Sequence, residues 1–312
     1  MKIKRLYQLF LASLLLAIGA GILLADLLEW KKLQFELVGG NVPTAQSMDE
    51  LRAIFADPLI CSGCHQNHFE AWSSSYHAKS VENAGFQALY NSYLGYLRSD
   101  DAKRALGRDS NAEDLRQCLF CHAPQVQFAS DQVVQQISDA IAAGRWDEIR
   151  GVQVNCAVCH SITPEGKWSR ESFTLAGTKY GPIRGPAPRE RSGHQSQYSE
   201  LHTKSEFCAM CHSLPPYNVY CSLVYDQYKD TPAARQGQVC QDCHMPATRN
   251  VPVAVGGNNN RVLHSHAFPG GRSKEMWPEA IDLNLVAEPR GANELLATVT
   301  MRSKVPHNIP DG

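Results

Sequence analysis

The same five-residue pattern, Cys-x-x-Cys-His, occurs five times in this chain of 312 residues. Two thiols three residues apart can form thioethers with both vinyl groups of one porphyrin, and the imidazole that follows can then bind the iron as proximal ligand. Each motif therefore predicts one covalently attached c-type haem, so five haems are expected. The predicted attachment cysteines and proximal histidines are Cys61, Cys64 and His65; Cys118, Cys121 and His122; Cys156, Cys159 and His160; Cys208, Cys211 and His212; and Cys240, Cys243 and His244.

Two other uses of paired cysteines agree less well with the sequence. Structural zinc sites also contain Cys-x-x-Cys pairs, but zinc gives no reason for a histidine to follow every pair. Since the chain has 12 histidines in 312 residues, five such coincidences have a chance of about one in ten million. A disulfide framework stabilises short secreted domains and likewise gives no reason for a histidine to follow each cysteine pair. The haem interpretation is therefore preferred to both.

Seven further histidines bear on what the haems can do. A second imidazole on the iron makes a six-coordinate haem that transfers electrons but binds no small molecule, whereas an open position can bind and activate a substrate. Five distal ligands predict an electron relay, and four leave one haem open for catalysis. The number of histidines allows either outcome. These seven residues are His68, His77, His194, His202, His264, His266 and His307.

Residues 1–28 predict a membrane anchor. Lys2, Lys4 and Arg5 precede an apolar run from Leu6 to Ala25, and about 20 apolar residues are enough to cross a bilayer as a helix. An uncleaved signal anchor is favoured over a cleaved signal peptide, because the apolar core of a signal peptide would be shorter. Positive charge before the helix then predicts a cytoplasmic or inner membrane anchor, with the haem domain on the periplasmic or extracytoplasmic side.

Composition constrains the fold and the partners. The formal net charge is -1, and the haem propionates would make the loaded protein distinctly acidic. No basic stripe or aromatic platform points to nucleic acid. The porphyrins are expected to supply most of the apolar core, which allows a thin, loop-rich chain. The predicted fold class is therefore mostly α and irregular, packed around the haems, with an N-terminal transmembrane helix and the start of a small C-terminal β element.

The chain divides into four predicted segments. They are a signal anchor or transmembrane helix at 1–28, a linker at 29–60, a pentahaem cytochrome c domain at 61–271, and a β-hairpin segment at 272–312 that ends in a haem-ligand motif. Helices are expected near 48–55, through 81–116 and at 130–145, from helical spacing of apolar residues. Apolar residues alternate from Ile281, Pro289-Arg290-Gly291 predicts a turn, and Glu294 to Met301 predicts the second strand.

The sequence around the first motif resembles a known family. The run Cys64-His65-Gln-Asn-His-Phe69-Glu-Ala-Trp72-Ser-Ser-Ser75-Tyr-His77-Ala78 is similar to the C-H-x-x-x-(Y/F)-x-x-W-x-x-S-x-H-A run of the cytochrome c-554 and hydroxylamine-oxidoreductase-like multihaem superfamily. The surroundings of the later motifs are also similar, so the resemblance covers roughly residues 58 to 312. The four-haem cytochrome of that family has one haem fewer than the five predicted here, so the chain departs from the family's electron carrier.

The resemblance also implies distal ligands. It assigns this role to His77, His194, His266 and His307, each serving a haem bound elsewhere in the sequence. His202 is the best fifth candidate, six residues before Cys208. His264 competes with His266 for one iron, because residues two apart in the sequence cannot both reach it easily. His68 follows its own haem on a helix and is not expected to be a ligand. Cys221 is the one cysteine outside the motifs and is expected to be a buried thiol.

Three functions follow from these features. The preferred one is a membrane-anchored electron relay through mainly bis-histidine haems, from a quinol-linked membrane donor or another redox partner to a periplasmic or extracellular acceptor. The alternative is a multihaem oxidoreductase that acts on hydroxylamine, nitrite or tetrathionate at one five-coordinate haem, substrates that the resemblance suggests. A third is self-assembly into a haem filament. Short membrane-anchored quinol dehydrogenases share the anchor but lack the motif contexts found here.

Overall fold

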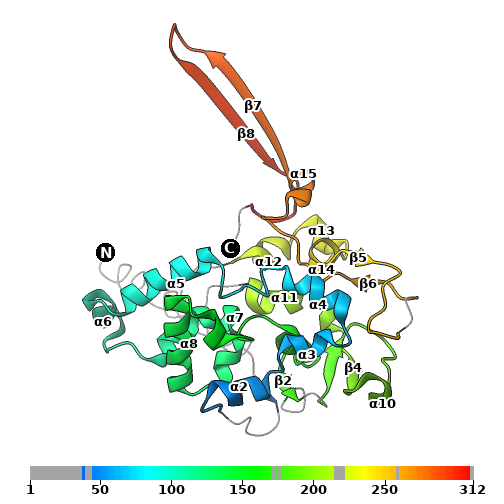
Figure 1. Ribbon diagram of the computed structural model, residues 1–312. Helices are drawn as coiled ribbons and strands as arrows, with labels where there is room; N and C mark the ends of the chain where they lie inside the picture. Colours follow the sequence, from blue (N-terminus) through cyan, green and yellow to red (C-terminus); the bar gives the residue numbers. More distant parts are fainter. Residues whose placement is uncertain are drawn as a thin grey trace, which may run out of the picture.

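A computed structural model describes residues 37–38, 44–169, 173–174, 177–213, 222–257 and 260–309. Figure 1 shows a body of short helices and connecting loops, from which one long β-hairpin projects. The α-helices of the described residues are α2 Met48–Ile54, α3 Pro58–Ser62, α4 Gln66–Ser73, α5 Ala84–Leu97, α6 Asp100–Leu106, α7 Ala112–His122, α8 Asp131–Ala143, α9 Cys156–His160, α10 Arg189–Ser192, α11 Ser205–His212, α12 Val224–Tyr228, α13 Pro232–Arg235, α14 Cys240–His244 and α15 Trp277–Ala280.

The strands pair two by two. Within the described residues they form four two-stranded sheets: β1 with β2 and β3 with β4 in parallel, and β5 with β6 and β7 with β8 antiparallel. The first three pairs are short and tie loops of the body together. Their bounds are β1 Leu37–Val38, β2 Trp168–Ser169, β3 Lys179–Gly181, β4 Ser196–Tyr198, β5 Ala247–Thr248, β6 Leu263–His264, β7 Ile281–Pro289 and β8 Leu295–Ser303.

Helix α7, which carries the second Cys-x-x-Cys-His motif, has a strongly fixed beginning. The Asn111 side chain accepts a hydrogen bond from the Glu113 amide, and the Asp114 carboxylate accepts one from the Asn111 amide, which forms a capping box. Arg108 donates two further hydrogen bonds to the same carboxylate, at 2.7 and 2.9 Å. The side chain of Asp114 is only 3% exposed, so this network anchors the helix that leads to His122.

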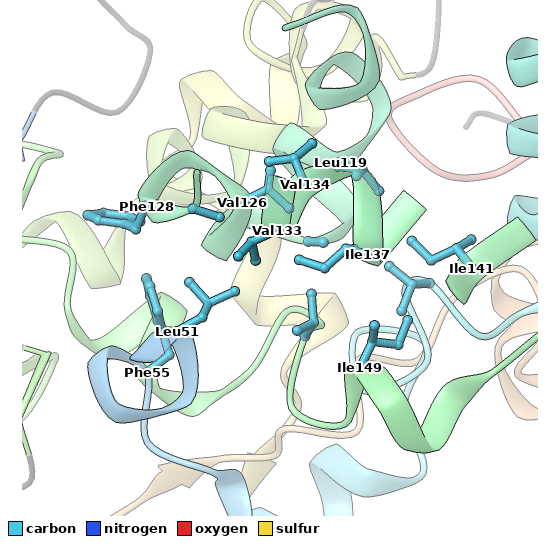
Figure 2. Close-up of a cluster of buried hydrophobic side chains, with 14 of the residues drawn as sticks. Leu51, Phe55, Leu119, Val126, Phe128, Val133, Val134, Ile137, Ile141 and Ile149 are labelled. Atoms are coloured by element: carbon cyan, nitrogen blue, oxygen red, sulfur yellow. The ribbon is translucent and has the colours of Figure 1, made fainter. Parts of the chain in front are cut away.

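A protein core packs against α7. Helix α8 begins at the Ser130 cap and ends at Gly144, which has a left-handed φ of 67°. Its apolar side chains recur every three or four residues, so they form one buried stripe against α7 and α5. Figure 2 shows this cluster, with the α8 side chains facing those of α2, α7 and the 3₁₀ helix at 124–128. The labelled side chains are Leu51, Phe55, Leu119, Val126, Phe128, Val133, Val134, Ile137, Ile141 and Ile149.

The local predictions agree with this fold to different degrees. Helix α2 and helix α8 confirm the helices expected at 48–55 and 130–145. The helix expected through 81–116 is divided into α5, α6 and the start of α7, because Ser99 and Asn111 each act as an N-cap that begins a new helix. The predicted hairpin is confirmed, with nine paired residues in each strand.

The predicted fold class was wrong in two respects. The described chain is a mixed helix and strand structure that has an apolar core of its own between α2, α5, α7 and α8. The predicted transmembrane helix is the second error: across the described ranges, no helix has the length and apolar character needed to span a bilayer.

The membrane prediction is corrected accordingly. The segment at 1–28 lies outside the described residues, and the described helices supply no membrane span. The localisation at an inner membrane, with the haem domain beyond it, rested on that span alone and is not retained.

Candidate haem centres

Each Cys-x-x-Cys-His motif lies on or at the end of a short helix. The motifs map to α3, the last turns of α7, and the helices α9, α11 and α14. Residues three apart on a helix lie on the same face, so the two thiols of each motif point to one side and the histidine follows at the end of the same turn. None of the ten motif cysteines is in a disulfide. This arrangement is compatible with two thioether bonds and one proximal imidazole at each motif.

Four of the five motif histidines are oriented by backbone carbonyl groups from segments remote in the sequence. A carbonyl oxygen only accepts, so a ring nitrogen beside it must be the protonated one, and the other ring nitrogen keeps the lone pair that binds a metal. In each contact the Nδ1 atom is bonded, which leaves Nε2 available. The partners are Val253 O at 2.6 Å from His65, Ser80 O at 2.8 Å from His122, Tyr180 O at 2.7 Å from His160, and Pro269 O at 2.7 Å from His244.

Four motif histidines each face a second histidine at nearly the same separation. With metal–nitrogen bonds of about 2.0 Å and a ring radius of about 1.15 Å, two imidazoles on opposite sides of one metal ion have centroids roughly 6.3 Å apart. The observed separations match that value, so the residues fit an iron held between two imidazoles. The pairs are His65 with His194 at 6.2 Å, His212 with His77 at 6.1 Å, His160 with His266 at 6.1 Å, and His244 with His307 at 6.2 Å.

Two of the second histidines, His77 and His266, are buried as neutral imidazoles. Desolvation by burial lowers the pKa of His77 and of His266 to about 3 in each case, so both rings are neutral at physiological pH, which is the metal-binding form. His266 Nδ1 is 3.0 Å from His264 O, and His307 Nδ1 is 2.9 Å from Asn308 O. These contacts again leave Nε2 as the free nitrogen.

The second motif differs from the other four. No histidine in the described ranges of the chain faces the His122 ring. Instead, Phe86 of α5 stacks on it, with ring centroids 4.0 Å apart and an interplanar angle of 21°. Ser80 holds His122 from two sides, since its carbonyl accepts from the ring and its hydroxyl donates to the His122 carbonyl. The site of the second motif is therefore well positioned but has one imidazole.

Contacts between motifs show which sites adjoin. Cys61 and Cys156 are close enough to shift each other's pKa, which their interaction lowers for Cys61 and raises for Cys156. Cys208 and Cys240 form a second such pair, with the pKa raised for Cys208 and lowered for Cys240. The Cys121 thiol donates to the Cys211 carbonyl, with 4.0 Å between Sγ and O. The first site therefore adjoins the third, and the fourth site adjoins both the second and the fifth.

Two side chains outside the motifs tie the first three sites together. Trp72 of α4 donates from its indole nitrogen to Val154 O at 2.9 Å, which joins the helix after the first motif to the loop before the third. Ser80 links the second and third motifs, because its hydroxyl oxygen also accepts from the Val154 amide at 3.1 Å. The sequence analysis assigned no role to Phe86 or Ser80. Only the family-like run around Trp72 and Ser75 signalled that this region is structurally constrained.

Other predicted residues occupy different positions. His202 stacks 5.8 Å from His160, which already faces His266, and its Nε2 is 3.2 Å from Cys159 O. Ligation by His202 stays a prediction that this geometry does not favour. His264 bonds to Met245 O through Nδ1. His68 lies 6.2 Å from His65, the same separation as His194, but at right angles to its ring, whereas His194 is tilted by 33°. It is also edge-on to His266 at 4.8 Å, and its buried Nδ1 has no hydrogen-bond partner among the described residues. Cys221 lies outside the described residues.

The five motifs and the histidines oriented beside them are compatible with covalent haem attachment. Residues 60–161, which are 102 of the 312 residues, match the family model of cytochrome c554 and c-prime. The matched segment contains the first three motifs and ends one residue after His160. No curated protein and no solved structure gives a significant match to the chain. The protein is a c-type cytochrome, with haem c as its covalently bound cofactor.

Proposed function

We propose that this c-type cytochrome carries five haems, one at each motif, and relays electrons through them between redox partner proteins. His194, His77, His266 and His307 supply the second axial ligands to the sites of His65, His212, His160 and His244, in that order. The observation that carries the proposal is the repeated separation of 6.1–6.2 Å between imidazole centroids in these four pairs. The match of residues 60–161 to the family model of cytochrome c554 and c-prime supports the same function.

The adjoining motifs suggest the order of the relay. Electrons pass between the first and third sites, whose Cys61 and Cys156 are neighbours, and between the fourth and fifth sites, whose Cys208 and Cys240 are neighbours. Cys159 of the third motif lies near Cys208 and Cys211 of the fourth, so the third site connects the first to the fourth and fifth. The second site adjoins the fourth and is a branch of this path. Covalent haem supplies the redox chemistry, and the protein sets each potential through axial ligand, burial and hydrogen bonding.

Two measurements on the haem-loaded protein test this proposal. Intact mass spectrometry should give the mass of the chain with five haems. Low-temperature EPR with spin quantification on the oxidised protein should then assign four haems out of five to low-spin, bis-histidine centres. A haem content below five contradicts the stoichiometry, and two or more high-spin haems contradict the proposed ligand pairs.

A second candidate function is supported by the site of His122. Because no described histidine faces this ring, the sixth position is open to a small molecule, and the protein is an oxidoreductase for a small nitrogen or sulfur compound such as hydroxylamine, nitrite or tetrathionate. In this case, one high-spin EPR signal should shift when nitrite, hydroxylamine or cyanide is added. A high-spin signal that none of these compounds changes favours the relay alone.

A further inference from the structure

The β7–β8 hairpin is the part of the protein with least cover. Figure 1 shows it extending away from the helical body, to which it is joined at its base by α15 and by the residues that follow β8. Every residue from Asp282 to Lys304 is exposed. A two-stranded hairpin alone is at best marginally stable in water, whereas these strands keep nine paired residues in register without a break. This hairpin requires a covering surface.

The two faces of the hairpin differ sharply. Residues directly opposite each other, and residues two apart along a strand, share a face. One face carries no charged side chain, and its five largest apolar residues are 56–69% exposed. The other face carries the Asp282–Arg302 pair and polar partners such as Asn284 and Thr300. From base to tip, the apolar face has the pairs Ile281–Ser303, Leu283–Met301, Leu285–Val299, Ala287–Ala297 and Pro289–Leu295.

We propose that the apolar face packs against the same face of a second copy, with the two hairpins antiparallel and the two-fold axis at the Leu285–Val299 pair. This operation places the large Leu283 of one copy over the small Ala287 of the other, and Met301 over Ala297. Large side chains therefore meet small ones on both sides of the axis, as interdigitated sheet packing requires. A two-fold operator uses the same patch on both copies, so one apolar face is enough.

The charged side chains at the base of the hairpin lie on its other face. Asp282 is opposite Arg302 on the neighbouring strand and forms an ion pair of 3.4 Å with Lys304. The apolar face therefore brings no charge into the contact, so two copies can pack together without burying an unpaired charge.

The size of the face also suits a dimer of moderate affinity. With about 100 Å² exposed by each of five large side chains on each copy, the contact buries roughly 1,000 Å² in total, close to the lower end of specific interfaces. Five of the large exposed apolar side chains of the described residues lie on this one face, whereas the other face of the hairpin carries only Val286 and Leu296 among its polar residues. A dissociation constant of about 1 μM is expected for a contact of this size.

The proposed dimer is a closed assembly, distinct from a filament. Nine residues per strand extend about 30 Å, so the antiparallel arrangement holds the two helical bodies at opposite ends of the paired hairpins. Electron transfer within one copy then does not require the other copy. The inference is independent of the proposed relay, because it depends only on the pairing and exposure of residues 281–304.

The test is sedimentation velocity of the full haem-loaded chain between 1 and 100 μM, concentrations chosen to bracket the expected constant of about 1 μM. The wild type should show a monomer–dimer equilibrium. Leu285→Lys places two like charges at the two-fold axis and should weaken the dimer by at least about 100-fold. The matched control is Asn284→Lys, which adds the same charge to the opposite face of the same strand and should change the constant by less than about threefold.

A size exchange tests the packing itself. Ala287→Leu opposes a large residue to Leu283 of the other copy and should weaken the dimer, whereas Leu283→Ala with Ala287→Leu exchanges the two sizes and should restore it. The haem absorption spectrum should be unchanged in all variants, because the hairpin lies outside the haem sites. A monomeric wild type at 100 μM overturns the proposal, as does a dimer equally sensitive to Asn284→Lys or one that the double variant fails to restore.

Discussion

The most direct perturbation of the proposed ligand pairs is His266→Ala. His266 lies 6.1 Å from His160, with the two rings nearly parallel. His202 also stacks on His160, but its Nε2 is bonded to a backbone carbonyl, so among the described histidines only His266 is placed to bind the same iron. Alanine removes the imidazole and leaves space for water on the iron. Water is a weak-field ligand, so the haem at the third motif should change from low to high spin. The other three ligand pairs should keep their geometry.

The size of the change follows from the number of sites. With five motifs and four facing pairs, one haem in five, at His122, should already be high spin in the wild type. His266→Ala should raise the fraction to two in five. Quantified low-temperature EPR measures this change directly, and the number of haems per chain from intact mass spectrometry fixes the scale. A doubling of the high-spin signal is well above the uncertainty of spin quantification.

His202→Phe is the matched control for this variant. His202 also stacks on His160, at 5.8 Å, and packs against Phe207 at 4.4 Å, but its Nε2 is bonded to the Cys159 carbonyl. Phenylalanine keeps an aromatic ring in the same space, so the high-spin fraction should stay at one in five. If His266→Ala leaves the spin state unchanged while His202→Phe raises the high-spin fraction, the assignment of the two histidines is reversed and the reasoning from ring separation is refuted.

Three further predictions concern the protein that surrounds the sites. Asp114→Asn should lower the free energy of unfolding by about 1–3 kcal/mol, because it weakens the buried capping network with Arg108. The Arg108 hydrogen bonds hold the pKa of Asp114 below its usual value, so in the wild type this stabilisation is present above about pH 4 and is lost as the pH falls through the lowered pKa. Thermal melts of both proteins between pH 2 and 7 should therefore converge at the acidic end. Trp72→Phe should cost about 1–2 kcal/mol, since the Val154 carbonyl loses its indole donor, and denaturant titration at constant haem content measures it. Ile137→Ala should cost about 2–5 kcal/mol through a cavity at a side chain with 0% exposure, while the spin-state spectrum stays that of the wild type.

The sequence was most informative where chemistry depends on short spacing. Cys-x-x-Cys-His places two thiols and an imidazole within one helical turn, so covalent haem attachment could be predicted without knowledge of the fold. The hairpin was also predictable, because strict alternation from Ile281 and the turn at Pro289-Arg290-Gly291 are local signals. The core of α7 and α8 was underestimated, since the argument from haem content assumed that porphyrins would replace it. The spacing of apolar residues in α8 predicted its buried stripe. The sequence did not show which helices pack against that stripe, because those contacts are between distant residues.

The orientation of the motif histidines could not be predicted from spacing, because it depends on carbonyl groups that have no signature in the sequence. The four carbonyl oxygens that orient His65, His122, His160 and His244 belong to loop, turn or strand residues, and none belongs to a helix. A helical carbonyl already accepts from the amide four residues later, whereas a loop carbonyl has its lone pairs available. Backbone outside helices is therefore needed at these positions to select the tautomer that presents Nε2 to the metal. Any residue type that keeps the loop conformation can supply such a carbonyl, so side-chain identity at these positions carries little information about the haem site.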